Sequence, residues 1–544
     1  MEMHFATIWE SLADAIGDAP AIVHGDVRRT WREYEDRAAR LASAYTAAGL
    51  EPGDRLGLLM YNGNEYLEAQ FGAIKQRLVP INVNYRYLDD ELVYLLENSD
   101  SKALVFHASL ADRVARVVPR LPDLRLLIAV DDGGEHTVEG ALAFEDVIAA
   151  NEPAPRITRD EGDHYMLYTG GTTGMPKGVI YAMGGTTAAF IESSFPVYGL
   201  TIPTDAAQIA PMVKDLIERG EQAVSIPCAP LMHGTGVWIG AMMPHLGGGN
   251  VVTLTSRSLD AAELLGTIER HKATMITIVG DAFSKPLLAE LDRATTAGTP
   301  YDTSSLKVIV SSGVMWTVEV KEQLLERIEH VMLIDAAGST EGTMGISIMM
   351  KGMPAPTGSF SGMPTTKVFT EDGRQVEPGS DEVGLIAAGG NVPLGYHKDE
   401  TKSAATFRVI EGVRYSFPGD MAKVAADGTL ILLGRGSNVI NSGGEKIFPE
   451  EVEEAVKRVP GVIDCLVVGV DDDRFGQAVN AVTSIELGAP VDEATIIASV
   501  KTQLAGYKAP KKVVFVDEVP RAPNGKGDYP SAKRYALEAA DQKL

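Results

Sequence analysis

The sequence predicts an α/β protein with a large N-terminal domain, a β-rich subdomain within it, and a small, mobile α+β domain at the C-terminus. Three observations support this fold class. Short apolar strands alternate with helices over residues 1–150 and again over 222–328, which is typical of a largely parallel sheet. Turn signals divide residues 372–433 into short strands. After residues 434–437 a new strand and helix pattern begins.

The first predicted helix has a capping box at its start. Thr30 precedes it and Glu33 follows three residues later, so each side chain can accept a bond from the other residue's backbone N–H. We expect this helix to end near Ala48. The alternation then predicts strand 55–60, helix 64–75, strand 79–83, helix 88–98 and strand 103–106, and the polar residues 131–155 predict an irregular connection.

The second half of the large domain repeats this alternation. Residues 193–222 are weakly patterned, and we interpret them as an insertion or lid-like segment. The predicted elements after it are strand 222–228, helix 259–271, strand 275–279, helix 284–291, strand 307–311 and helix 317–328.

The small domain is predicted from its own helix and strand. Pro449 followed by Glu450 and Glu451 indicates a helix start, because acids in the first turn interact favourably with the helix dipole. A strand is expected over 465–470. We place the two domains at 1–436 and 437–544.

Bulk properties limit the classes of function. The 544 residues are too many for one hydrophobic core. The net charge of −25 argues against a nucleic-acid surface, so an anionic substrate must be bound by a local patch. Cys228 and Cys465 lie in apolar runs and are predicted to be core residues, without disulfide or zinc spacing. We see neither a signal peptide nor an integral membrane segment, so a cytoplasmic location is expected, with peripheral contact at a membrane left open.

Residues 168–178 predict a loop that binds a polyphosphate. They lie between two apolar runs, as a loop between two strands does. Glycines let the backbone turn its N–H groups toward one point, while threonine hydroxyls and a lysine add donors. The spacing differs from that of a P-loop, because Lys177 is three residues beyond Gly174 and a proline intervenes. The candidate ligands are Thr169, Gly170, Gly171, Thr172, Thr173, Gly174 and Lys177.

This loop resembles the phosphate loop of the adenylate-forming enzymes, which include acyl-CoA synthetases, peptide-synthetase adenylation domains and beetle luciferases. Further motifs in the expected order extend the resemblance over almost the whole chain. They occupy residues 334–341, 414–420, 434–453 and 519–526.

The resemblance assigns the motif at 334–341 to the nucleotide and its metal. Glu341 would hold Mg²⁺, a hard cation that prefers carboxylate oxygen, and Thr340 would contact phosphate. Ala337 stands where the family usually has an adenine-stacking tyrosine. The backbone around Ala337, Gly338 and Ser339 would therefore define the base pocket.

Two further motifs imply contacts to the ribose and a hinge. Asp420 would accept hydrogen bonds from both ribose hydroxyls, and Arg435 would contact ribose or phosphate. Ser437 occupies the position of the family's hinge residue, which is usually an Asp or Lys.

The small domain would supply a catalytic lysine and a surface for CoA. Lys526 would reach the substrate carboxylate and the α-phosphate, where it would neutralise developing charge. After domain rotation, the backbone of Ser442, Gly443 and Gly444 would pack beside the pantetheine arm.

The acid pocket is implied by residues 230–236, a motif in which an aromatic residue or histidine borders the acyl group. His233 would take this place, and Gly280 and Asp281 would lie near the same pocket by analogy. Residues 395–400 and 523–526 are most similar to a subgroup of actinobacterial type, which activates steroid side chains and other bulky acids.

The implied function is an ATP- and Mg²⁺-dependent acid–CoA ligase that forms an acyl-adenylate and then a thioester. The acid would be a steroid side-chain, fatty or aryl-alkanoic acid, and a homodimer is left open. Three alternatives remain: an adenylation enzyme that loads a separate carrier protein, a luciferase-type oxygenase, and a nucleotide-binding regulator without catalysis.

Overall fold

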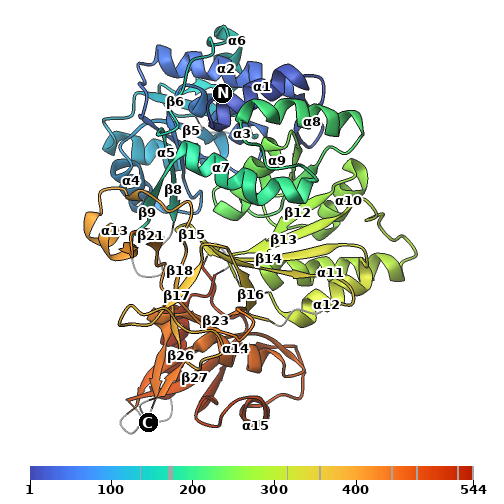
Figure 1. Cartoon of the computed structure of the whole chain (residues 1–544), viewed down its shortest axis with the longest axis vertical. Coiled ribbons are helices and arrows are strands. Elements are labelled where there is room, and N and C mark those ends of the chain that lie inside the picture. The colour runs from blue at the N-terminus through green and yellow to red at the C-terminus, as the bar shows by residue number, and fades with distance from the viewer. Residues whose placement is uncertain are drawn as a thin grey trace.

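The computed structural model describes residues 1–134, 137–169, 175–314, 316–353, 357–442, 445–472, 476–522 and 526–541. Figure 1 shows a large body formed by the blue to yellow part of the chain and a small orange to red unit at one end. The predicted α/β fold with a large N-terminal and a small C-terminal domain is therefore confirmed.

The first sheet of the large domain is parallel throughout its described strands. Its central strands are buried on both faces and are therefore continuous apolar runs rather than alternating ones. In order across the sheet they are β4 (Val79–Asn82), β3 (Arg55–Leu59), β5 (Ser101–His107), β6 (Leu126–Val130) and β7 (Leu142–Ala143).

Helices α2, α3 and α4 follow the predicted bounds closely. The capping box between Thr30 and Glu33 is present at the start of α2. Helices α5 and α6 were not predicted, and α6 lies in the stretch expected to be an irregular connection. The helices are α2 (Trp31–Ala47), α3 (Asn64–Lys75), α4 (Asp89–Asn98), α5 (Ala111–Val117) and α6 (Phe144–Ala150).

The second sheet joins the rest of the large domain into one surface of thirteen described strands. Its centre is parallel, and after β14 it continues with antiparallel strands. Strands β18, β22 and β23 of the β-rich stretch extend the main sheet, whereas β20 (Phe407–Ile410) and β21 (Val413–Ser416) pair with each other in a separate two-stranded sheet. The order is β17 (Lys367–Phe369), β18 (Gly384–Ala387), β22 (Asp420–Val424), β23 (Leu430–Arg435), β16 (Ser359–Gly362), β15 (Gly342–Met349), β14 (Met332–Ser339), β13 (Val308–Ser312), β12 (Met275–Ile278), β10 (Val224–Pro227), β11 (Asn250–Thr253), β1 (Pro20–His24) and β2 (Val27–Thr30).

Helix α3 packs between the two sheets, contacting β3 and β4 of one and β1 of the other. Every residue of α3 except Glu65 is buried. Its buried Lys75 is compensated by Glu10 at 2.6 Å and Glu35 at 2.5 Å. Because a buried charge is stable only when it is paired, this network fixes α3 against its neighbours.

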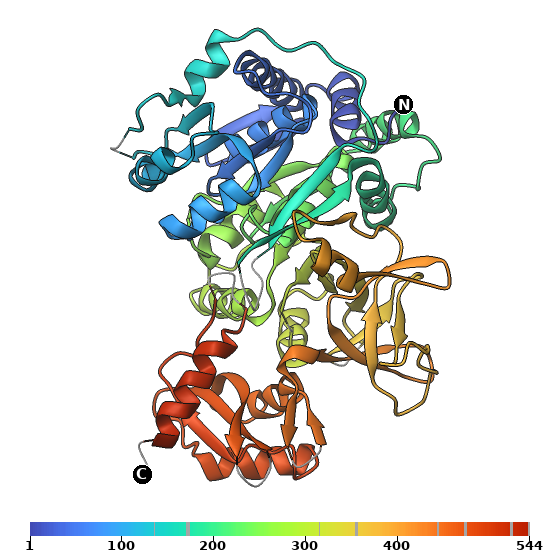
Figure 2. The ribbon, with the colours of Figure 1, turned by 90° about the vertical axis from the view of Figure 1, so that its left-hand side faces the viewer.

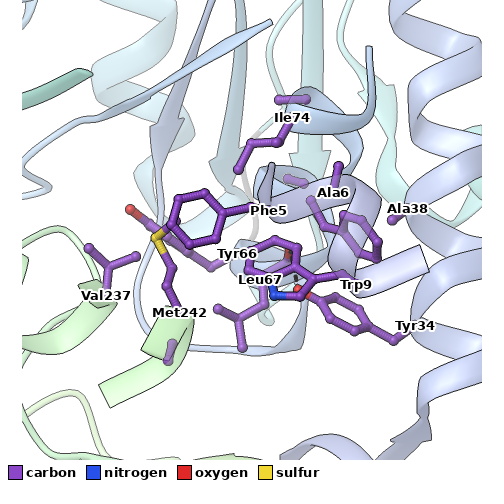
Figure 3. Close-up of a cluster of buried hydrophobic side chains, with 14 of the residues drawn as sticks. Phe5, Ala6, Trp9, Tyr34, Ala38, Tyr66, Leu67, Ile74, Val237 and Met242 are labelled. Atoms are coloured by element: carbon purple, nitrogen blue, oxygen red, sulfur yellow. Dashed lines mark hydrogen bonds between the residues drawn. The ribbon is translucent and has the colours of Figure 1, made fainter. Parts of the chain in front are cut away.

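The N-terminal helix α1 (Phe5–Ala15) belongs to the same core. Trp9 meets Phe71 of α3 edge to face at a centroid distance of 5.0 Å. Figure 3 shows Phe5 and Trp9 in one cluster with Val237 and Met242, which come from a π-helix at Thr235–Met242. The core thus extends to the helix that follows the His233 motif.

The interpretation of residues 193–222 as a lid-like insertion was wrong for their second half. Helix α8 (Ile209–Glu218) buries Ile209, Val213 and Leu216 and packs against α1. This segment is a fixed part of the large domain.

Three elements complete the covering of the second sheet, and a small sheet lies beside it. The helices are α10 (Ala261–His271), α11 (Gly280–Thr296) and α12 (Val318–Arg327). The small sheet has the order β19 (Gly395–Tyr396), β9 (Lys177–Ala182) and β8 (His164–Thr169), all antiparallel.

The C-terminal domain is an independent α+β unit with its own apolar core. Its helix α14 begins at Pro449, as predicted, and its long strands β26 and β27 form a hairpin. Its elements are β24 (Ile440–Ser442), β25 (Glu445–Ile447), α14 (Pro449–Lys457), β26 (Val462–Asp472), β27 (Gly476–Ile485), α15 (Glu493–Gln503), β28 (Lys512–Phe515) and α16 (Tyr529–Asp541).

None of the helices in the described ranges combines the length and the apolar run that crossing a bilayer requires.

Candidate active site

The predicted phosphate loop connects two antiparallel strands. Strand β8 ends at Thr169 and β9 begins at Lys177, and these two residues lie opposite each other in the ladder. The prediction of a loop between two strands is confirmed. The candidate ligands Gly170, Gly171, Thr172, Thr173 and Gly174 lie outside the described residues.

Lys177, at the far end of the loop, is held by a second segment. Its Nζ lies 2.7 Å from Oδ2 of Asp399 and 5.7 Å from the centroid of the Tyr396 ring. The hydrogen bond from Lys177 lowers the pKa of the Asp399 carboxyl. The lysine is thus held by a charge-assisted hydrogen bond at the start of β9.

The Thr340–Glu341 turn is anchored to the same small sheet. It joins β14 to β15, where Ala337 lies opposite Gly345. The Tyr396 hydroxyl donates to Oε1 of Glu341 at 2.8 Å, and the Tyr181 hydroxyl donates to the carbonyl of Thr340 at 2.8 Å.

Within this turn, the backbone N–H of Glu341 donates to Oγ of Ser339 at 3.2 Å. Gly338 lies opposite Thr343 in the hairpin. The structure therefore places the predicted residues 337–341 next to the two strands that carry the phosphate loop.

Glu341 is the carboxylate that the sequence predicts to hold a metal ion in this region. Among the residues that the structure describes, no group of three or more His, Cys, Asp or Glu side chains is arranged to hold a metal ion. Magnesium is commonly bound by one or two carboxylates together with substrate phosphates, and Glu341 beside a phosphate loop fits that mode.

His233 is partly buried in the segment that follows β10. Burial, followed by the positive charges of Lys526 and Arg86, lowers the pKa of its imidazole from 6.5 to about 4. The ring is therefore neutral at physiological pH, and its Nε2 forms no hydrogen bond with a described residue. A neutral ring of this kind can border an uncharged acyl group.

Lys526 of the small domain contributes to this lowering of the His233 pKa through its positive charge. The two residues come from different domains, and Figure 2 shows the red unit below the strands of the large body. The catalytic role of Lys526 and the place of His233 in the acid pocket stay predictions.

Gly280 and Asp281 begin α11, next to the main sheet. The N–H of Gly280 donates to Oγ of Ser311 at 2.9 Å. The Asp281 carboxylate accepts from the N–H and the hydroxyl of Thr317, at 3.1 Å for the closest oxygen in each case. Asp281 thus anchors Thr317, the residue that precedes α12, and its place in the acid pocket stays a prediction.

Asp420 and Arg435 lie directly opposite each other on β22 and β23. Asp420 is buried, with 8% of its surface exposed. Ser442 is also buried, at the end of β24. The side chains of Arg435 and Ser437, and the residues Gly443 and Gly444, lie outside the described part of the structure.

Tyr181, Tyr396, Asp399 and Asn82 contribute to the site without having been given a role from the sequence. Residues 395–400 were noted only for their resemblance to a subgroup. Asn82 lay in a predicted strand, and only its hydrogen bonds reveal its importance.

The chain thus consists of a large α/β body, in which Tyr396 bonds to Glu341 and contacts Lys177, and a small α+β domain with its own core. The AMP-binding enzyme family matches residues 9–397, and the AMP-binding enzyme C-terminal domain matches residues 451–526. The chain belongs to the AMP-binding enzyme family.

Three known proteins illustrate its relationships. The chain is 40% identical to the medium/long-chain-fatty-acid–CoA/3-oxocholest-4-en-26-oate–CoA ligase of Mycolicibacterium smegmatis, over 98% of this chain and 96% of the relative. It is 38% identical to the 3-oxocholest-4-en-26-oate–CoA ligase of Rhodococcus rhodochrous, over 100% and 98%. The fold matches the crystal structure of the anthranilate CoA ligase AuaEII in complex with anthranoyl-AMP, with a TM-score of 0.85, 24% identity, and coverage of 99% and 98%.

Proposed function

We propose that the chain is an AMP-forming acid–CoA ligase. The observation that supports this proposal is the contact of the small domain with the large one, in which Arg458 pairs with Glu319 and the charge of Lys526 acts on the pKa of His233. A carboxylate would attack the α-phosphate of ATP, releasing pyrophosphate and forming an acyl-adenylate. The CoA thiol would then attack this mixed anhydride, releasing AMP and the acyl-CoA thioester.

In the first step, the chain's own residues position charges rather than form a covalent bond. Lys177 and the phosphate loop would hold the departing β- and γ-phosphates, while Lys526 would neutralise charge between the carboxylate and the α-phosphate. Asp420 would hold the ribose. Positioning and electrostatic stabilisation of this kind supply most of the rate in such a reaction.

Mg²⁺ belongs to the proposal because Glu341 is oriented beside the phosphate loop. The bond from Tyr396 occupies Oε1 of Glu341, and a carboxylate has further acceptor positions for a cation. When bound, the ion would neutralise phosphate charge.

The acid is proposed to be a bulky hydrophobic one, such as a fatty acid or a steroid side-chain acid. Two relatives with about 40% identity over nearly the full chain carry such acids in their names. A neutral, partly buried His233 is compatible with an apolar acyl chain beside it.

The second step requires a change in the arrangement of the domains. We place the boundary between residues 436 and 437, with Ser437 as the hinge. Rotation would withdraw Lys526 and bring residues 442–444 to the CoA arm. A cytoplasmic location, where ATP and CoA are abundant, with peripheral membrane contact and a homodimer, completes the proposal.

The test is ATP–pyrophosphate exchange with a panel of steroid, fatty and aryl-alkanoic acids, followed by thioester detection with CoA. Exchange with a bulky acid and formation of its CoA thioester are expected. Exchange without a thioester would indicate a carrier protein as the acceptor, and absence of exchange with every acid would indicate a non-catalytic nucleotide-binding protein.

A further inference from the structure

Asn82 is a buried side chain that bonds to two separate segments of the site. It ends β4 of the first sheet and exposes only 7% of its surface. Its Oδ1 accepts from the N–H of Tyr168 at 2.7 Å. Its Nδ2 donates to the carbonyl of Tyr168 at 2.8 Å and to that of Met232 at 2.6 Å. Both amide protons and the carbonyl oxygen are thus engaged.

The two bonded segments are the ones that lead into the phosphate loop and the acid pocket. Tyr168 precedes Thr169, where β8 ends, and Met232 directly precedes His233. The two N–H groups of the planar Asn82 amide point in directions fixed by its geometry. The carbonyls of Tyr168 and Met232, which accept from them, are therefore held at fixed positions relative to each other. If the side-chain amide of Asn82 were removed, these hydrogen bonds would no longer hold Tyr168 and Met232 in a fixed position relative to each other.

We propose that Asn82 is a positioning residue that sets the phosphate loop and the His233 segment relative to each other. ATP and the carboxylic acid are thereby brought to one point. This inference rests on the proposed function, because it takes the first segment to bind ATP and the second to border the acid.

The chain offers a matched control in Asn62. Its Oδ1 accepts from the N–H of Leu231 at 2.7 Å, and its Nδ2 donates to the carbonyls of Pro227 and Ala229 at 3.3 and 3.2 Å. Asn62 therefore makes as many hydrogen bonds as Asn82, three in total, but all of them go to residues 227–231 and none reaches the strand that leads into the phosphate loop.

The experiment compares Asn82→Ser with Asn62→Ser in the full-length enzyme. ATP binding is measured by calorimetry in the absence of acid, and the KM values for ATP and the acid are measured by pyrophosphate exchange. Asn82→Ser is expected to weaken ATP binding and to raise both KM values by roughly tenfold, because two or three buried bonds are lost. Asn62→Ser is expected to raise only the KM for the acid. Unchanged ATP binding in a folded Asn82→Ser enzyme, or an equal loss in Asn62→Ser, would overturn the inference.

A measurement on the unmodified enzyme covers the case in which Asn82→Ser does not fold. Hydrogen exchange is followed in peptides covering 168–178 and 230–236. ATP alone is expected to slow hydrogen exchange in both peptides. The acid alone is expected to do the same, because coupling between two binding sites is reciprocal. Protection confined to the directly contacted peptide would overturn the inference. If the wild-type enzyme shows no exchange of pyrophosphate with any acid, the proposed function fails instead.

Discussion

Tyr396 connects two parts of the ATP site through one side chain. Its hydroxyl donates to Glu341, and its ring lies under the ammonium group of Lys177. A cation beside an aromatic face is attracted by the ring's negative π surface. Tyr396 therefore orients both the carboxylate proposed for Mg²⁺ and the lysine proposed for phosphate.

Replacement of Tyr396 by Phe separates these two contacts. The ring stays beneath Lys177, but Glu341 loses its donor, so the carboxylate is less well oriented for a cation. We expect the Mg²⁺ concentration for half-maximal pyrophosphate exchange to rise about 5- to 20-fold, as the loss of a charged hydrogen bond allows. Tyr415→Phe, in a ring packed against Phe369, is the control. A Mg²⁺ dependence equal to that of the control would refute the orienting role of Tyr396.

At the scale of elements, helix α14 holds the small domain against the large one. Arg458, which follows α14, pairs with Glu319 of α12 at 3.2 Å. Lys285 of α11 donates to the carbonyl of Ile463 at 3.1 Å. These contacts accompany the arrangement in which Lys526 lies near His233, so they favour the adenylating conformation.

Removing both contacts should change the balance of the two half-reactions. Exposed pairs contribute about 0.2–1 kcal/mol each, so Lys285→Ala combined with Arg458→Ala should slow adenylation about two- to fivefold. Thioester formation from supplied acyl-adenylate should be maintained. The two half-reactions are assayed separately, and Lys272→Ala, which breaks an exposed pair with Asp302, serves as control. Equal slowing of both steps would contradict this role.

Local signals explain which elements were predictable from the sequence. The capping box at Thr30 and the acids after Pro449 act within one helical turn, and both helices start where these residues predict. Helix α8 was not predicted, because Pro211 lies near its start and proline in a sequence usually argues against a helix. A proline is tolerated within the first turn, where its missing N–H would have no helical partner.

Tertiary contacts explain what the sequence could not predict. The joining of β16 to β15 and β23 extends one sheet through segments far apart in the chain, and no local pattern contains that pairing. The motif residues of the site were identified, but their supports Tyr396 and Asn82 act through hydrogen bonds to distant segments. Such bonds become visible only when the fold brings the partners together.

For the whole molecule, buried histidines make stability depend on pH. Burial lowers the pKa of His107, His233 and His245 from 6.5 to about 4. Between these values the unfolded chain binds protons that the folded chain does not bind. The contribution of these histidines to the free energy of unfolding is therefore fully present above pH 6.5, and it is lost as the pH falls toward 4.

This dependence can be measured through the melting temperature. The melting temperature should fall as the pH is lowered from 6.5 to 4.5, because each buried imidazole lowers the free energy of unfolding by about 1 kcal/mol per pH unit. His245 packs among aromatic rings and has its Nε2 3.2 Å from the carbonyl of Ala21. His245→Gln should make the slope shallower, whereas exposed His330→Gln should not. Identical slopes in both variants would exclude the titration of His245 as a cause.

We propose that one enzyme carries out two half-reactions and uses Lys526 only in the first. The most direct measurement is the activity of Lys526→Ala in each half-reaction, with exposed Lys501→Ala of α15 as control. We predict that pyrophosphate exchange falls about 100-fold or more, because a charge that stabilises the transition state is lost. Conversion of supplied acyl-adenylate and CoA to the thioester should stay within a few-fold of the wild-type rate. An equal loss in both half-reactions would contradict the two-conformation mechanism.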